Sequence, residues 1–150
     1  MLSEKEIVIV NAENLILGRM ASKIAKMLLT GKRVVVVNAE KAMISGERNM
    51  VIEGYKKLWS VRTLRNPDKQ GPRRPQSPRN IVKRAVRGML PRKPKGKEAL
   101  SNLKVYIGIP KEFHGKEMIK FEDVVADLSK GRYISVGELS EALGWRGVIA

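Results

Sequence analysis

The sequence predicts an α/β fold built around a parallel β-sheet. Residues 7–10 and 34–37 are continuous runs of Ile and Val, which are typical of strands buried on both faces of a sheet. The chain between them carries the apolar spacing of an amphipathic helix. A strand, a helix and a second strand within about thirty residues indicate a right-handed βαβ unit, in which the two strands run parallel.

The helix of this unit is expected over residues 17–28. Its apolar positions follow the spacing that places side chains on one helical face; they are Leu17, Met20, Ala21, Ile24, Ala25 and Leu28. Gly31 stands where a helix commonly ends in a left-handed residue. A second helical pattern covers residues 47–62, with Val51 and Tyr55 on one face.

A third helix is indicated by its capping residues. Ser77 followed by Pro78 is typical of an N-cap with proline at the first helical position, and Pro91 ends the helix. The apolar stripe of this helix consists of Ile81, Val82, Ala85, Val86 and Met89. Residues 98–103 can then form a short helix.

The remaining chain is expected to complete the α/β body. Residues 104–109 read as a buried strand, and residues 121–128 have the spacing of a small helix. Ser135 and Glu138 form a capping-box pattern before another apolar stretch, and Gly144 is a plausible end for that helix.

The excess positive charge of the chain lies in one segment. The 150 residues include 30 Lys and Arg against 15 Asp and Glu, which gives a net charge of +15. Residues 56–97 contain fifteen of these cations and a single acid, Asp68, so this segment alone carries +14. The rest of the chain is nearly neutral. We call residues 56–97 the basic segment, and we expect its partner to be a polyanion, most commonly a nucleic acid.

The two halves of the basic segment predict different structures. Between Arg65 and Arg79 there is no aliphatic or aromatic residue, while prolines and a glycine interrupt helix and sheet, so we expect an extended arm that becomes ordered against the polyanion. An idle linker is the alternative, but charge of one sign favours contact with RNA or DNA. In the second half, Arg79, Lys83 and Arg87 recur on one face of the predicted helix, with Arg84 at its margin.

Motifs of enzymes and metal sites are missing from the sequence. The turn before the first helix has one glycine, Gly18, and matches neither the dinucleotide fingerprint nor the phosphate loop. The single histidine, His114, has no cysteine to act with, and the lack of cysteine also excludes disulfides and fits a reducing cytoplasm. The chain has no long apolar run, and residues 1–6 open it with mixed charge, unlike a leader. We therefore expect no enzyme, cofactor, metal, small-molecule substrate or membrane contact.

Aromatic residues make up 5% of the chain. Most stand at helical spacing beside apolar neighbours, so core packing is the favoured interpretation for Tyr55 and Trp145. Trp59, at the edge of the basic segment, remains a candidate for stacking on a base. A charge-rich, aromatic-poor chain favours contact with the backbone of a folded RNA over binding of a single strand.

Several ordered blocks of the sequence resemble the large-subunit ribosomal protein L13 family. Residues 17–22 (LGRMAS) and 31–40 (GKRVVVVNAE) are similar to the start of that family, and residues 84–91 (RAVRGMLP) and 103–110 (LKVYIGIP) to its central signature. Residues 55–59 (YKKLW) run into an Arg- and Pro-rich stretch, which resembles the archaeal and eukaryotic branch. Beyond residue 110 the resemblance is weaker.

The resemblance implies a three-layer α/β/α fold with a parallel sheet of about four strands, to which a basic extended arm and peripheral helices are attached. It also implies one ribosomal-protein domain over residues 1–150, with the basic segment inserted as an RNA-binding extension. The implied function is that of a structural, cytoplasmic constituent of the large ribosomal subunit. Its partners would be large-subunit rRNA, from early in assembly, and neighbouring large-subunit proteins.

The expected RNA contacts are the basic residues, together with Trp59 and with Gly88 at the exit from the third helix. The full set is Arg48, Trp59, Arg62, Arg65, Arg73, Arg74, Arg79, Lys83, Arg84, Arg87, Gly88, Arg92, Lys93, Lys95 and Lys97. A free-standing nucleic-acid-binding regulator is the alternative function, since charge alone does not exclude it. An α/β enzyme acting on nucleotides is disfavoured, because its phosphate loop is missing.

Overall fold

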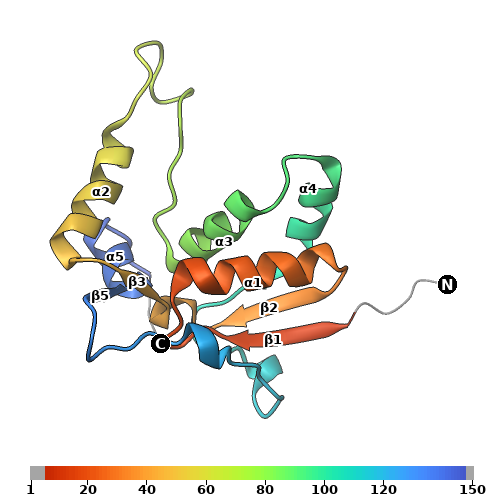
Figure 1. Ribbon diagram of the computed structural model, residues 1–150. Helices are drawn as coiled ribbons and strands as arrows, with labels where there is room; N and C mark the ends of the chain where they lie inside the picture. Colours follow the sequence, from red (N-terminus) through yellow and green to blue (C-terminus); the bar gives the residue numbers. More distant parts are fainter. Residues whose placement is uncertain (1–5, 148–150) are drawn as a thin grey trace.

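The computed structural model describes residues 6–147 and has a mixed α/β architecture (Figure 1). Its main sheet contains β1 (Ile7–Asn11), β2 (Arg33–Val37) and β4 (Leu103–Val105), in the order β1-β2-β4. β1 pairs with β2, and β2 with β4, in parallel. The predicted α/β class with a parallel sheet is therefore confirmed.

The sheet has three strands where the family resemblance implied about four. Outside β1, a single parallel bridge joins Val10 to Ile119, and Asn11 N donates to the carbonyl oxygen of Ile119 at 3.0 Å. Short 3-10 helices at Lys111–Phe113 and Glu122–Val124 flank this bridge. The chain between these turns is extended only briefly. Ile119 alone therefore pairs with β1 where a fourth strand was expected.

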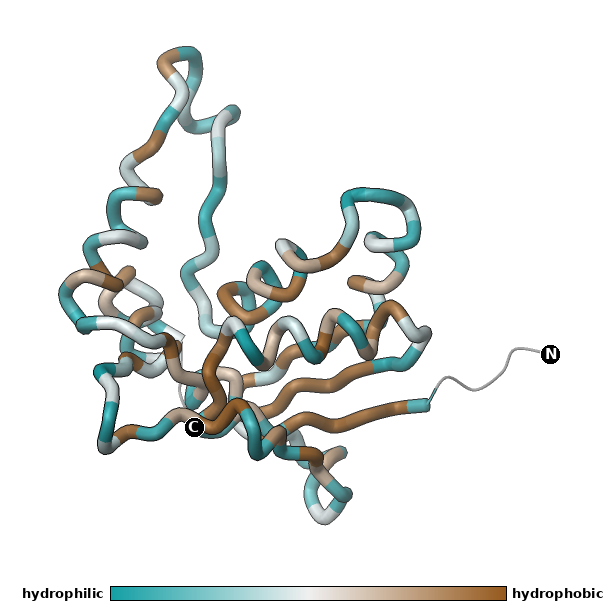
Figure 2. The backbone as a smooth tube through the Cα atoms, viewed as in Figure 1, coloured by the Kyte–Doolittle hydropathy of each residue, from teal (hydrophilic) through white to brown (hydrophobic). Residues whose placement is uncertain are grey.

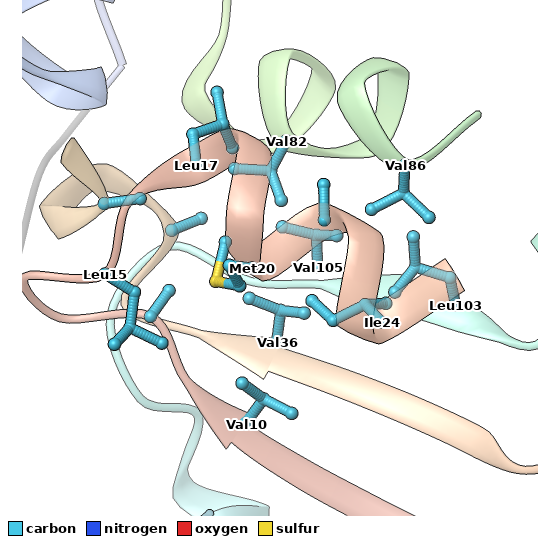
Figure 3. Close-up of a cluster of buried hydrophobic side chains, with 14 of the residues drawn as sticks. Val10, Leu15, Leu17, Met20, Ile24, Val36, Val82, Val86, Leu103 and Val105 are labelled. Carbon is cyan, nitrogen blue, oxygen red and sulfur yellow. The ribbon is translucent and has the colours of Figure 1, made fainter. Parts of the chain in front are cut away.

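The first helix, α1 (Leu17–Leu29), connects β1 to β2 as predicted. Its buried residues are the six that the spacing indicated: Leu17, Met20, Ala21, Ile24, Ala25 and Leu28. Gly31 follows at φ +93°, so the predicted left-handed end of the helix is confirmed. Figure 3 shows Met20 and Ile24 of α1 meeting Val36 of β2 in the core, with Val82 from α3 (Pro78–Met89) close by.

The two faces of the sheet are covered by different kinds of structure. On one face, Val8, Val10, Val34 and Val36 form one buried cluster with the apolar faces of α1 and α3. On the other face a smaller cluster forms from Ile9, Val35, Val37 and Phe113. The predicted burial of β1 and β2 on both faces is confirmed, and both strands are strongly apolar in Figure 2. The implied third layer, however, is a loop with a 3-10 turn, because so few side chains on that face need cover.

A small antiparallel sheet, not predicted from the sequence, joins the middle of the chain to its C-terminal part. β3 (Met43–Ser45) pairs with β5 (Tyr133–Ser135). The side-chain Oγ of Ser135 then accepts a hydrogen bond from Glu138 N at 3.2 Å and caps α5 (Val136–Ala142). This confirms Ser135 as the N-cap, whereas the Glu138 carboxylate pairs with Arg48 in place of the return bond of a capping box. Gly144, at φ +96°, ends this region.

The strand predicted over residues 104–109 is shorter than expected. It ends at Val105, and Gly108 turns the chain at φ +68° while its N–H donates to the Glu40 carboxylate at 3.0 Å. The short helix before it, α4 (Pro94–Ser101), begins four residues earlier than the predicted 98–103, because Pro94 provides a first helical position.

The small helix predicted over residues 121–128 does not form beyond the 3-10 turn at its start. Val125 makes an antiparallel bridge with Leu15, and Ala126 N donates to the carbonyl oxygen of Asn14 at 2.8 Å. This pairing with a distant segment keeps the backbone extended. The helical spacing of the apolar residues was therefore misleading here.

The longest helices of the described chain, α1 and α2 (Arg48–Ser60), have 13 residues each. A helix that crosses a bilayer needs about 20 predominantly apolar residues. Within residues 6–147, no helix has the length and hydrophobicity for such a span. Of the mixed-charge opening, residues 1–6, the first five lie outside the described residues.

Candidate nucleic-acid interface

The cations of the basic segment have no carboxylate partner within residues 6–147. The six ion pairs of this part of the chain all join residues outside the basic segment. In one of them, Lys23 of α1 donates to Asp123, and this hydrogen bond lowers the pKa of the aspartate below its usual value. The body therefore balances its own charge, whereas the basic segment is left to attract an external anion.

The basic segment begins on the last turns of α2, which stands away from the main sheet (Figure 1). Trp59, near the end of α2, is 40% exposed. Tyr55, one turn earlier, packs against the main core, as expected, and burial raises the pKa of its hydroxyl. Trp59 is thus free of the core, and its stacking on a base stays a prediction.

Arg48 is separated from the other predicted contacts. It is the first residue of α2, at the end away from the basic segment, and its Nη1 lies 3.5 Å from Glu138 Oε2 on α5. An exposed pair of this kind is weak, but it gives Arg48 a partner within the protein. The structure does not bring Arg48 together with the cations of the basic segment.

The arm expected between residues 65 and 79 is observed over residues 61–77, which leave α2 and return to α3 without helix or strand (Figure 1). Its tip is closed by local bonds: two backbone amides donate to Asn66 O, and the Thr63 hydroxyl donates to Arg65 O at 3.1 Å. Arg62 and Arg65 are exposed. The arm therefore presents cations well away from the α/β body.

The returning part of the arm is attached to the body. Gln76 Nε2 donates to the carbonyl oxygen of Leu143, just after α5, at 2.7 Å. The side-chain Oγ of Ser77 then accepts a hydrogen bond from Asn80 N at 3.3 Å, and Pro78 is the first residue of α3. The predicted N-cap is therefore confirmed. These contacts fix the direction in which the chain enters α3.

α3 has one apolar face and one cationic face, as predicted. Its buried residues are Pro78, Ile81, Val82 and Val86. Met89, expected in the apolar stripe, is 44% exposed, because α3 ends there and the chain turns toward α4. Arg79, Arg84 and Arg87 are exposed, and Lys83 is half-buried. The apolar face packs on α1, which leaves the cations facing outward.

Four further cations occupy the turn after α3 and the start of α4; Arg92, Lys93, Lys95 and Lys97 are all exposed. Gly96 is required by packing, because a Cβ there would lie 1.8 Å from Pro91 O. Gly88 is different. A Cβ on Gly88 would meet no heavy atom within 4 Å, so the fold itself does not explain a glycine at this exposed helical position.

Two neighbouring cavities lie between the returning part of the arm, α3 and α4. The first has a volume of about 350 Å³, and its lining includes Arg73, Arg74, Asn80, Lys83, Arg84 and Arg87. The second has a volume of about 620 Å³, and its lining includes Arg74, Arg84, Arg87, Gly88, Arg92 and Lys97. Arg74, Arg84 and Arg87 line both. No carboxylate of the described chain lines either cavity. We call the two cavities together the arginine cleft.

The structure therefore groups some of the predicted contacts and separates others. Those at the arginine cleft are Arg73, Arg74, Lys83, Arg84, Arg87, Gly88, Arg92 and Lys97. Those exposed elsewhere on the basic segment are Trp59, Arg62, Arg65, Arg79, Lys93 and Lys95. Asn80, which also lines the first cavity, was not predicted as a contact, because its amide side chain is neutral. Its position four residues before Arg84 places the two side chains on the same face of α3, and this spacing could have indicated it.

Catalytic groups are not assembled around these cavities. Within residues 6–147, no three His, Cys, Asp or Glu side chains are grouped so that they could hold a metal ion. The Nε2 atom of His114 lies 3.1 Å from Ile109 O in an exposed turn. Among the described residues, the lining of both cavities is rich in cations and contains no carboxylate or histidine that could transfer a proton.

Comparison with known proteins identifies the family. The family model for ribosomal protein L13 matches residues 5–112. The chain belongs to the ribosomal protein L13 family. The large ribosomal subunit protein uL13 of Sulfolobus acidocaldarius is 60% identical to it, over 96% of this chain and 97% of the relative. The uL13 proteins of Saccharolobus solfataricus and Archaeoglobus fulgidus are 54% and 46% identical, over 96% and 93% of this chain and 97% and 89% of the relatives.

Membership of the L13 family makes the chain a structural component rather than an enzyme, as the sequence predicted. These relatives are archaeal, which agrees with the branch that residues 55–59 resemble. Their alignments also extend over nearly the whole chain, beyond the L13 family model. The C-terminal part that forms β5 and α5 is thus shared with these uL13 proteins, although its sequence carries no clear family motif.

Proposed function

We propose that this L13-family chain is a structural constituent of the large ribosomal subunit in the cytoplasm, where it binds and scaffolds large-subunit rRNA. The supporting observation is the set of fifteen cations in residues 56–97, none of which has a carboxylate partner in the described chain. In this proposal residues 1–150 are one domain, and the basic segment is its RNA-binding extension.

The proposed mechanism is electrostatic and geometric. RNA helices repel one another through their phosphates, and cations placed between them reduce this repulsion. The arm enters a crevice between RNA helices, while α3 and the start of α4 contact the backbone at the base of the arm. Arginine suits this role because its guanidinium binds phosphate oxygens in a bidentate manner.

The remaining contacts follow from where the side chains lie. The exposed ring of Trp59 stacks on an unpaired base beside the arm. The nearly neutral body faces neighbouring large-subunit proteins, for which strong positive charge would be a disadvantage. Because the basic segment brings RNA helices together, the chain acts from early in the assembly of the subunit.

Salt dependence tests the proposed binding. If about half of the fifteen cations contact phosphate, the logarithm of the binding constant for deproteinised large-subunit RNA falls by roughly 5 to 7 per decade of salt, at about 0.7 to 0.9 per contact. Filter binding or fluorescence anisotropy between low and moderate salt measures this slope. A flat dependence contradicts the proposal.

A matched pair of variants locates the binding surface. Replacing Arg73, Arg74, Arg84 and Arg87 with Ala is expected to weaken binding strongly and to reduce the salt slope. The control removes the same charge from exposed positions of the body that have no ion-pair partner among residues 6–147, by replacing Lys26, Lys104, Lys111 and Lys120 with Ala. The control variant should keep the affinity, whereas equal losses in both variants would mean that only net charge matters.

Sedimentation separates a ribosomal constituent from a free-standing regulator. The constituent stays with large subunits after a moderate salt wash of a cell extract. A regulator is found instead among the proteins that do not sediment with large subunits. Recovery of the chain in that fraction alone contradicts the proposal.

A further inference from the structure

Arg74 and Arg84 face each other across the junction of the arm with α3. Both line the two cationic cavities, and both also line a third, largely apolar cavity of about 260 Å³ beside Tyr55, Pro75 and Ile81. Unlike its neighbour Arg73, Arg74 is half-buried. Its long side chain is thus held between the arm and α3, which limits where the guanidinium can lie.

Within residues 6–147, the guanidinium of Arg74 has no carboxylate partner. Its Nε is buried and has no acceptor among the described residues. Burying a charged donor without a partner is unfavourable, and Arg84 and Arg87 add two further positive charges around the same cavities. Since no described carboxylate lines the cleft, an anion that binds there supplies an acceptor for Arg74 and reduces the repulsion between the three arginines.

We propose that the arginine cleft is a preorganised site for adjacent phosphate groups of one RNA strand, held jointly by Arg74, Arg84 and Arg87. This inference rests on the proposed RNA binding and names the place where the backbone is held most tightly. Two neighbouring cavities that share three arginines fit a continuous strand better than a single terminal phosphate. Other cations of the basic segment contribute charge without this shared geometry.

The lining of the cleft also argues against a free nucleotide as the ligand. No aromatic side chain lines either cationic cavity, so a base would find no ring on which to stack. Gly88 leaves one wall without a side chain, and nothing in the fold fills that space. An open wall of this kind allows a sugar-phosphate backbone to approach the helix closely.

Occupation of the cleft is linked to the position of the arm. Arg74 lies two residues before Gln76, whose side chain binds the carbonyl oxygen of Leu143. The contact at Gln76 holds the returning part of the arm against the body and so places Arg74 over α3. By linkage, RNA that binds Arg74 in the cleft stabilises the docked arm, and the docked arm strengthens RNA binding.

A double-mutant cycle tests whether the arginines act together. The variants are Arg74→Gln, Arg84→Gln and their combination, and the probe is deproteinised large-subunit RNA at one fixed salt concentration. Each single change is expected to weaken binding several-fold. The double variant should lose less than the product of the two effects by about threefold or more, because both side chains hold the same phosphates.

The control cycle combines Arg74→Gln with Arg62→Gln, which removes an exposed cation of the arm outside the cleft. The two effects should multiply to within about twofold, as they do for independent sites. If the losses of affinity multiply in both cycles, Arg74 and Arg84 act independently and the shared site is contradicted. RNA binding by the basic segment would still stand. Failure of the unmodified protein to bind the RNA overturns the proposed function instead.

A second cycle tests the link to the arm. Gln76→Ala is expected to weaken RNA binding when Arg74 is present and to have little effect in the Arg74→Gln background. An equal effect in both backgrounds contradicts the link. Thermal unfolding and circular dichroism check that each variant folds; if a Gln variant does not, Arg74→Lys and Arg84→Lys replace it, since they keep the charge but lose the bidentate geometry.

Competition distinguishes the source of the phosphate. Inorganic phosphate and adenosine monophosphate are added to the complex of the unmodified protein with RNA at constant ionic strength. A strand-binding site resists both competitors. Saturable binding of adenosine monophosphate that displaces the RNA overturns the assignment to a strand and makes the cleft a nucleotide site.

Discussion

At the scale of single residues, two nearby glycines stand in opposite surroundings. Gly96 is packed so closely against Pro91 O that no other residue fits. Gly88 is exposed within α3, where glycine is less favourable than alanine, and no neighbouring atom explains it. The protein therefore keeps a residue at position 88 that weakens its own helix, which is consistent with a requirement for space outside the fold.

Replacing Gly88 with Ala separates stability from binding. Gly88→Ala is expected to raise the free energy of unfolding by about 0.5 to 1 kcal/mol, because alanine loses less entropy in a helix. It should also weaken RNA binding several-fold, since the methyl group enters the cleft. Chemical denaturation and RNA titration measure the two effects.

The control for this variant is Gly54→Ala. Gly54 is also exposed within a helix, and its added Cβ also meets no atom within 4 Å, but it does not line the cleft. This control is expected to be stabilised in the same way and to bind RNA as the unmodified protein does. Unchanged RNA binding by Gly88→Ala would show that the open wall is not used.

At the scale of elements, α2 is the most weakly attached helix. It has no buried residue, and it meets the core only through partly buried side chains, which include Val51, Ile52 and Tyr55. α3, in contrast, buries a continuous apolar face on α1. The arm is therefore anchored more firmly where it enters α3 than where it leaves α2.

The ionisation of Tyr55 reports on the attachment of α2. Burial raises the pKa of Tyr55 in the folded protein, so the folded state retains the hydroxyl proton more strongly than the unfolded state. The resulting stability is complete below the ordinary tyrosine pKa of about 10 and is lost as pH rises through the higher, folded value. The free energy of unfolding should thus fall with alkaline pH.

Tyr55→Phe removes this contribution. The difference in unfolding free energy between the two proteins, measured by denaturation at several alkaline pH values, should change in favour of the variant as pH rises. Tyr106 and Tyr133 are present in both proteins and cancel in the comparison. A difference that stays constant with pH would mean that the Tyr55 hydroxyl is not buried in solution.

At the scale of the whole molecule, stability and binding are separated in space. The α/β body holds the core and balances its own charges, while the arm projects from it (Figure 1). The hydrogen bonds of the arm tip, residues 63–71, are made within the tip itself. Removing the tip should therefore disturb function much more than folding.

Replacing residues 63–71 with a short Gly-Ser link tests this separation. The thermal midpoint is expected to change by less than about 3 °C, which corresponds to at most about 1 kcal/mol in a domain of this size. RNA affinity should fall, and the salt slope should decrease by roughly 1 to 2 as Arg65 and Lys69 are lost. A large loss of stability would show that the tip contributes to folding.

Much of the protein was determined by the sequence alone. The βαβ unit was predictable because the apolar period of α1 and the Val-rich runs of β1 and β2 are local signals of which faces are buried. The caps at Ser77 and Ser135 were predictable for the same reason, since each acts within one helical turn. The position of the positive charge is a property of the sequence itself, and a one-signed segment of this kind predicts a nucleic-acid partner whatever the fold.

Only the tertiary structure decided which distant residues meet. β3 pairs with β5, the chain after residue 121 pairs with Leu15, and Arg48 pairs with Glu138, because these segments lie far apart in the chain and no local spacing records their approach. The arginine cleft depends on the same kind of contact. Charge alone selected its arginines among many cations, and the docking of the arm onto α3 determined that Arg74, Arg84 and Arg87 share one site.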